Sequence, residues 1–109
     1  MKKITELLGI QYPIFQGAMA HIARYPLVSA VSEAGGLGII AAGGLSGEEL
    51  REQIRETKKR TKKPFAVNLM LQMENISEQV DVLIAEGVKI VTTGAGTPKP
   101  YMDKLKQAN

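Results

Sequence analysis

Four apolar segments recur along this chain at intervals of about one βα unit. They begin at residues 13, 37, 65 and 88, so successive starts are 24, 28 and 23 residues apart. Each segment is apolar almost throughout instead of alternating, which is typical of strands buried on both faces of a sheet. Repeated βα units of this kind predict a parallel sheet covered by helices. The expected strands are 13–16, 37–41, 65–71 and 88–92.

Helix signals lie between these segments. Ser46 followed by Glu49 forms a capping box, which predicts a helix from there to about Arg60. Asn75 with Glu78 three residues later predicts the cap of the next helix. The other expected helices are a short turn over 4–8, a helix over 26–34, and a last one starting at Pro98 or Pro100.

Length and composition narrow the class of protein. A chain of 109 residues fits one domain, whereas a (β/α)8 barrel typically needs about 250 residues. A net charge of +3 with dispersed basic residues calls for neither a nucleic-acid partner nor a membrane surface. The absence of cysteine excludes disulfides and thiolate sites, and we expect no metal site. No secretory signal is recognisable at the start, so a cytoplasmic location is expected.

Four segments of the chain resemble a known family. These are Pro13-Ile-Phe-Gln-Gly-Ala-Met19, Ala34-Gly-Gly-Leu-Gly-Ile-Ile40, Pro64-Phe-Ala-Val-Asn-Leu-Met-Leu71 and Val91-Thr-Thr-Gly-Ala-Gly96. In this order they resemble the flavin-dependent nitronate monooxygenases and type II enoyl-acyl carrier protein reductases, and the reductase branch more closely. One difference is Ala18, where the family usually has a second glycine.

The resemblance implies an α/β fold of the (β/α)8 TIM-barrel type, of which residues 1–109 supply the N-terminal half, about the first four βα units. It implies that the carboxyl ends of the strands hold FMN. The backbone of Gly17, Ala18 and Met19 would border the isoalloxazine ring, Asn68 would donate a side-chain hydrogen bond to it, and Gly94 would line it. His21 and Gly96 would lie on the substrate side. The family's catalytic histidine belongs to a later Gly-Gly-His segment, beyond this chain.

Plainer interpretations exist for the same residues. The glycines are also ordinary turn residues, Asn68 could simply satisfy a strand end, and a lone loop histidine such as His21 is often incidental. The run of basic residues over 58–63 complements a helix C-terminus, with docking of an acidic acyl carrier protein as a minor alternative. Residues 36–41 match G-x-G-x-x-A, but they leave a helix and enter a strand, the reverse of a dinucleotide-binding turn.

The function that the resemblance implies first is an FMN-dependent enoyl-acyl carrier protein reductase of fatty acid synthesis, using NADH or NADPH. The alternative is a nitronate monooxygenase acting on alkyl nitronates. An alternative of another class is a non-catalytic, truncated half-barrel. The expected partners are a small molecule or an acyl thioester, possibly on acyl carrier protein. Open strand edges also predict self-association of the chain.

Overall fold

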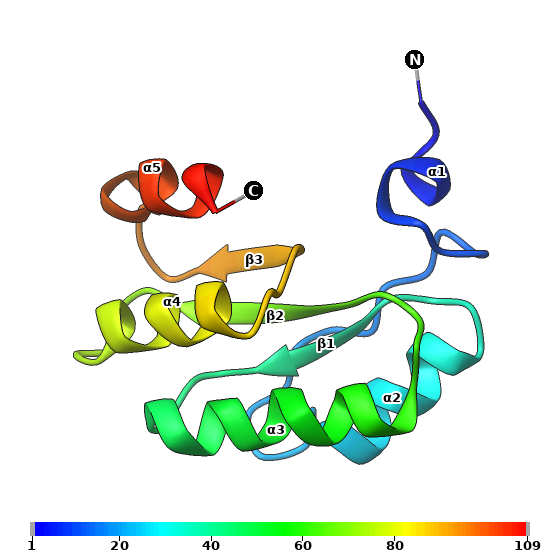
Figure 1. The fold of residues 1–109 in the computed structure, drawn as a ribbon, viewed down its shortest axis with the longest axis horizontal. Coiled ribbons are helices and arrows are strands. Elements are labelled where there is room, and N and C mark those ends of the chain that lie inside the picture. The colour runs from blue at the N-terminus through cyan, green and yellow to red at the C-terminus, as the bar shows by residue number, and fades with distance from the viewer. Residues whose placement is uncertain (1, 109) are drawn as a thin grey trace.

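The structure is a computed structural model that describes residues 2–108 as alternating helices and parallel strands (Figure 1). The elements in chain order are α1 (Ile4–Leu8), α2 (Tyr25–Glu33), β1 (Gly38–Ala41), α3 (Gly47–Arg60), β2 (Phe65–Met70), α4 (Ile76–Ala85), β3 (Val91–Gly94) and α5 (Lys99–Gln107). None of these helices has the length and apolar character needed to cross a membrane.

The sheet has three parallel strands in the order β1-β2-β3. The strand expected over 13–16 is wrong as an extended element, because Phe15 forms only an isolated bridge to Leu37. The Gln16 N–H donates to the Leu37 carbonyl at 3.0 Å, but among residues 2–108 no backbone pairing follows it. Instead, the side chain of Gln16 bonds both backbone groups of Ile39.

The last strand begins later than expected, at Val91 instead of 88. Gly87 adopts the left-handed conformation after α4, with φ 72°. The Val88 N–H then donates to the Leu83 carbonyl at 3.0 Å, which holds Val88 in the helix-ending turn. Backbone engaged in this turn is not free to pair with β2.

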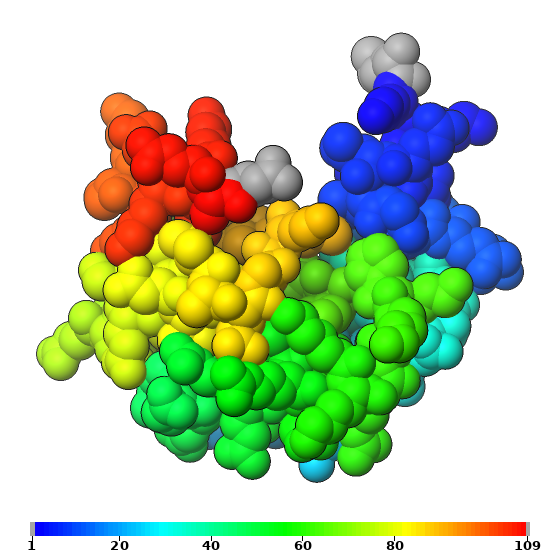
Figure 2. Space-filling view, viewed as in Figure 1, coloured from blue at the N-terminus to red at the C-terminus, as the bar shows by residue number. Residues whose placement is uncertain are grey.

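The two faces of the sheet have different neighbours. Helices α2, α3 and α4 pack side by side over one face, where Ile40, Val67 and Leu69 are fully or almost fully buried. On the other face Leu37, Ile39 and Ala66 form a smaller cluster with Ile10, next to α1. Helix α5 stands apart from this N-terminal segment (Figure 2) and packs on the first face, where Tyr101 and Leu105 contact the larger cluster. The second face corresponds to the interior of a barrel.

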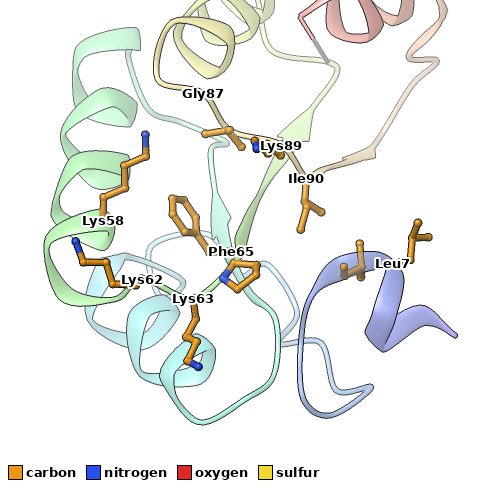
Figure 3. A pocket seen from close by; sticks show the side chains of 11 residues that line it. Leu7, Lys58, Lys62, Lys63, Phe65, Gly87, Lys89 and Ile90 are labelled. Carbon is orange, nitrogen blue, oxygen red and sulfur yellow. The ribbon is translucent and has the colours of Figure 1, made fainter. Parts of the chain in front are cut away.

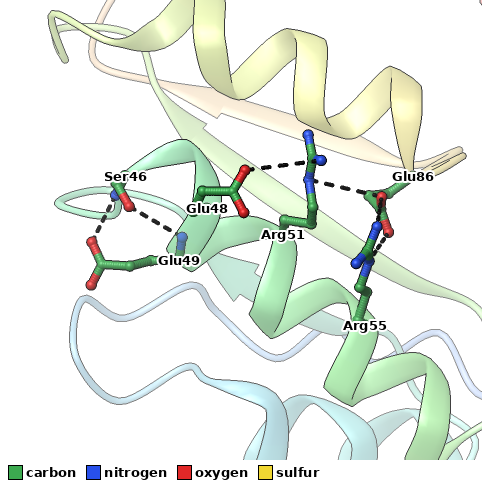
Figure 4. Close-up of polar contacts among 6 residues, drawn as sticks. All are labelled: Ser46, Glu48, Glu49, Arg51, Arg55 and Glu86. Atoms are coloured by element: carbon green, nitrogen blue, oxygen red, sulfur yellow. Dashed lines mark hydrogen bonds and ion pairs between the residues drawn. The ribbon is translucent and has the colours of Figure 1, made fainter.

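The start of α3 confirms the capping box. Ser46 Oγ accepts from the Glu49 N–H at 3.1 Å, and Glu49 Oε1 accepts from the Ser46 N–H at 3.0 Å (Figure 4). Asn75 precedes α4 as expected, but its side chain makes no capping bond. It donates instead to the Leu45 carbonyl at 2.9 Å, because the loop after β1 lies within its reach.

Helices α3 and α4 are joined by an ion-pair cluster around Glu86 (Figure 4). Arg55 donates two hydrogen bonds to this carboxylate, at 3.0 and 3.2 Å, and Arg51 lies 3.9 Å from it. The Glu86 side chain is only 11% exposed. The hydrogen bonds from Arg55 hold the pKa of Glu86 below its usual value, against the opposing effect of burial.

Candidate functional site

The carboxyl ends of the strands meet at one edge of the sheet, which we call the rim: residues 16–24, 41–45, 68–71 and 92–96. The register brings the rim residues level with one another. Asn68 pairs with Ala41 on one side and with Thr92 on the other, and Met70 pairs with Gly94. In barrels built from βα units, this is the edge where ligands bind.

The segment 17–21 presents free backbone donors at the rim. None of its five N–H groups donates to another residue within 2–108, and the segment lies outside the helices and strands. Unpaired N–H groups are costly when they are buried away from water, so such a run marks a place for solvent or a ligand acceptor. The predicted residues Gly17, Ala18 and Met19 belong to this segment, and Gly17 and Met19 are exposed.

Both ends of this segment are attached to β1. At its start, the Gln16 carboxamide accepts from the Ile39 N–H and donates to the Ile39 carbonyl, each at 3.1 Å. At its end, Arg24 Nη1 donates to the Ala41 carbonyl at 2.6 Å, and the Ala41 N–H donates to the Ala23 carbonyl at 3.1 Å. The free N–H groups are therefore carried on a loop with fixed ends.

Asn68 lies half-buried on the barrel-interior face. The Thr92 hydroxyl donates to Asn68 Oδ1 at 2.7 Å. Within the described chain, Asn68 Nδ2 has no hydrogen-bond acceptor. The amide oxygen therefore has a protein partner. The nitrogen remains a donor for a ligand, as the resemblance requires.

Two of the predicted glycines have open space beside them. A methyl group at the Cβ position of Gly17 or Gly94 would meet no heavy atom within 4 Å apart from those of its chain neighbours. At Gly38, by contrast, it would lie 2.2 Å from the Val28 carbonyl oxygen, so that glycine serves helix packing. Ala18, the departure from the family pattern, packs against the cluster of Leu37, Ile39 and Ala66.

The two residues predicted on the substrate side are exposed. His21 has φ 67°, a left-handed conformation that is uncommon for residues other than glycine, although asparagine, aspartate and histidine adopt it more often than most. Gly96 has φ 151°, and a methyl group there would lie 3.0 Å from Leu71 Cβ. No hydrogen bond joins the side chain of His21 to the rest of the described rim. These roles stay predictions.

Three rim contacts escaped the sequence argument. Gln16 and Arg24 act through hydrogen bonds from their side chains to the backbone, and no sequence motif predicts these bonds. Gln79 is fully buried and donates to the carbonyls of Ala42 and Leu45, at 2.8 and 2.9 Å. A signal for Gln79 was present, because it lies three residues after Ile76 on the apolar stripe of α4.

A cavity of about 500 Å³ lies at the opposite end of the strands, between α1 and the starts of β2 and β3 (Figure 3). Its lining combines the apolar side chains of Leu8, Phe65 and Ile90 with lysines. Its lining includes none of the predicted site residues, so cavity volume and predicted site residues point to different ends of the strands. The rim is the candidate site, because the free N–H donors and the glycines with open space beside them lie there. Within residues 2–108, no three histidine, aspartate or glutamate residues are grouped as a metal site.

Comparison with known proteins gives consistent matches. The family model described as nitronate monooxygenase matches residues 1–82. A probable nitronate monooxygenase of Staphylococcus saprophyticus is 40% identical and covers 96% of this chain but 40% of its own length. A second relative is a (3aS,4S,5R,7aS)-5-hydroxy-7a-methyl-1-oxo-octahydro-1H-indene-4-carboxyl-CoA dehydrogenase of Mycobacterium tuberculosis. It is 36% identical, and the match covers 96% of this chain and 30% of the length of the dehydrogenase.

A solved structure, FabK from Thermotoga maritima, superposes with a TM-score of 0.94 at 45% identity. The match covers 96% of this chain and 34% of that protein. The chain thus spans about a third of the length of the relatives it matches. The likeness confirms the expected fold class, a partial barrel of the (β/α)8 type, with three parallel strands here and the remaining one reduced to a bridge.

Proposed function

The chain belongs to the nitronate monooxygenase family, whose members are flavin-dependent oxidoreductases, and from this we propose that its rim binds the ring end of FMN. The observation that carries the proposal is the run of five N–H groups over 17–21 that have no partner among residues 2–108, at the same edge of the sheet as Asn68, whose Nδ2 has no acceptor there. The pyrimidine edge of the flavin ring offers carbonyl and nitrogen acceptors that match such donors. The open space at Gly17 and Gly94 admits a flat ring.

Each part of the rim then has a task. The backbone of Gly17, Ala18 and Met19 binds the ring edge, and Asn68, oriented by Thr92, adds a side-chain donor. The apolar Met19 and Met70, each 42% exposed, exclude water from the ring. Bound FMN supplies hydride transfer, and the protein's contribution is to orient the ring toward the substrate.

For the substrate we rank an enoyl thioester first, reduced at the expense of NADH or NADPH. The support is the resemblance of the strand exits to the reductase branch and the high similarity to FabK. Acyl carrier protein as the thioester carrier belongs to the same proposal. The second candidate is oxidation of an alkyl nitronate, which the family model and the staphylococcal relative support equally well.

The experiment purifies the protein as its cell makes it, releases the cofactor by heat and identifies it by chromatography. We expect FMN, with about one ring per chain. Two assays then separate the candidates: oxidation of NADH or NADPH with an enoyl thioester, and oxygen uptake with an alkyl nitronate. A protein without flavin would contradict the proposal and favour a non-catalytic half-barrel. Flavin without either activity would contradict both substrates.

A further inference from the structure

Gln16 makes more rim contacts than a strand-end residue requires. Its Oε1 accepts from the Ile39 N–H, and its Nε2 donates to the Ile39 carbonyl, both at 3.1 Å. The same Nε2 also donates to the carbonyl of Gly17, the first residue of the free-donor segment. Both hydrogens of the amide are therefore used, one on β1 and one on the loop.

The bond to Gly17 sets the direction of the next peptide. In a trans peptide the carbonyl and the following N–H point in opposite directions. No cis peptide occurs in residues 2–108. Because Gln16 holds the Gly17 carbonyl, the Ala18 N–H is directed away from the Gln16 carboxamide. That N–H is one of the five without a protein partner.

We propose that Gln16 is a positioning residue, which orients the Gly17–Ala18 peptide so that the Ala18 N–H donates to the flavin ring. This inference rests on the proposed function, since it names the flavin as the acceptor. Arg24 holds the far end of the loop, and Gln16 holds its near end. The peptide between Gly17 and Ala18 is therefore the one that Gln16 orients. An apolar residue at position 16 would free this peptide without removing any group that touches the ring.

Two substitutions separate the contacts of Gln16. Gln16→Met keeps the length of the side chain and removes all three bonds. Gln16→Glu keeps the acceptor for the Ile39 N–H but loses both donors, and so releases the Gly17 carbonyl. The matched control is Gln53→Met: the Gln53 side chain accepts from the Tyr25 N–H at 2.9 Å and makes no hydrogen bond to segment 17–21. All are compared in the protein as its cell makes it.

The first measurement is the FMN dissociation constant by quenching of flavin fluorescence. Loss of one well-placed hydrogen bond predicts binding weaker by about tenfold in both Gln16 variants. The second is hydrogen exchange with and without FMN. The Ile39 amide should exchange faster in Gln16→Met but not in Gln16→Glu. Protection of the Ala18 amide by FMN should be lost in both, while Gln53→Met behaves as wild type with only a lower melting temperature.

The failures are distinguishable. A wild-type protein that binds FMN, with Gln16→Met and Gln16→Glu both within twofold of its affinity, overturns the role of Gln16 and leaves the proposed function standing. If Gln53→Met weakens FMN binding as much as the Gln16 variants do, the role of Gln16 is overturned as well. General destabilisation of the fold would then explain the weaker binding. A wild-type protein that binds no flavin overturns the proposed function, and the role of Gln16 toward the ring falls with it.

Discussion

Asn68 is a polar side chain in an otherwise apolar strand, and the structure divides its amide between two tasks. The oxygen accepts from Thr92, and the nitrogen is free. We predict that Asn68→Ala weakens FMN binding by about tenfold, because one donor to the ring is lost. The fold should remain intact, since Asn68 is only half-buried. Flavin fluorescence and the melting temperature measure the two effects.

Asn68→Leu and Thr92→Val are the companion variants. Asn68→Leu should match Asn68→Ala in FMN affinity, because the donor is absent in both. Thr92→Val keeps the donor but loses its orienting bond, so its affinity should lie between those of wild type and Asn68→Ala. Unchanged FMN affinity in both Asn68 variants would remove this residue from the site.

Gln79 and Asn75 share one acceptor, and this sharing is open to measurement. Both donate to the Leu45 carbonyl, at 2.9 Å each. Either single variant, Gln79→Leu or Asn75→Ala, leaves the Leu45 carbonyl one side-chain partner. Asn75→Ala should cost about 1 kcal/mol, and Gln79→Leu should cost more, because it also removes the bond to the Ala42 carbonyl. The double variant leaves the Leu45 carbonyl without either, so its cost should exceed the sum by about 0.5–3 kcal/mol. Urea unfolding of the four proteins measures the coupling, and strict additivity would contradict a shared acceptor.

At the scale of elements, Glu86 links α3 to the end of α4, and this link depends on pH. The pKa of Glu86 is lowered in the folded chain, mainly by hydrogen bonds from Arg55. A lowered carboxyl pKa stabilises the fold above the unfolded pKa of about 4.3, and the contribution is lost as pH falls through the folded value. We therefore predict that Glu86→Gln lowers the melting temperature by a few degrees at about pH 7.

The difference between wild type and Glu86→Gln should shrink steadily below about pH 4. Glu52→Gln is the control, because Glu52 is exposed on α3 and has no ion pair among residues 2–108. Its melting temperature should follow wild type at every pH. A difference between wild type and Glu86→Gln that persists unchanged at about pH 2 would assign the effect to packing.

Much of the element order was predictable from local signals. The capping box at Ser46 and the apolar run from Phe65 determine their elements through nearby residues. The reduction of the strand expected over 13–16 to a single bridge was not predictable. Gln16 bonds to β1 through its side chain, and a hydrophobic pattern does not encode such a bond. The late start of β3 depends on a turn that uses Val88.

The rim, too, was predictable from the sequence only in part. The sequence predicts which strand ends meet, since parallel strands align their carboxyl ends, and the structure brings Gly17, Asn68 and Gly94 to that rim. It does not predict Thr92 as the partner of Asn68, because that bond joins residues 24 positions apart. Side-chain bonds across such distances depend on register, and register is set by packing.

The whole chain leaves its sheet open. Among residues 2–108, β3 pairs only with β2, and Phe15, 47% exposed, lies beside β1 at the other side. Unpaired strand edges with exposed apolar side chains promote association. We predict that the 109-residue chain dimerises or aggregates on its own. Sedimentation velocity at several concentrations measures this.

A charge on the open edge should weaken that association. Thr93 is exposed on β3, so Thr93→Lys places a charge there without disturbing the core. The variant should shift sedimentation toward the monomer. A single monomeric species for wild type, with cooperative unfolding, would contradict the predicted self-association.

The central claim is that the rim over 17–21, Asn68 and Gly94 is where FMN binds. Hydrogen exchange of the protein as its cell makes it, with and without FMN, tests it directly. Because the N–H groups of 17–21 have no partner among the residues that the structure describes, they should exchange quickly alone and become protected when FMN is bound. Peptides covering the lysine-lined cavity, with Lys62 and Lys89, should not change. Protection at that cavity, with 17–21 unaffected, would contradict the account.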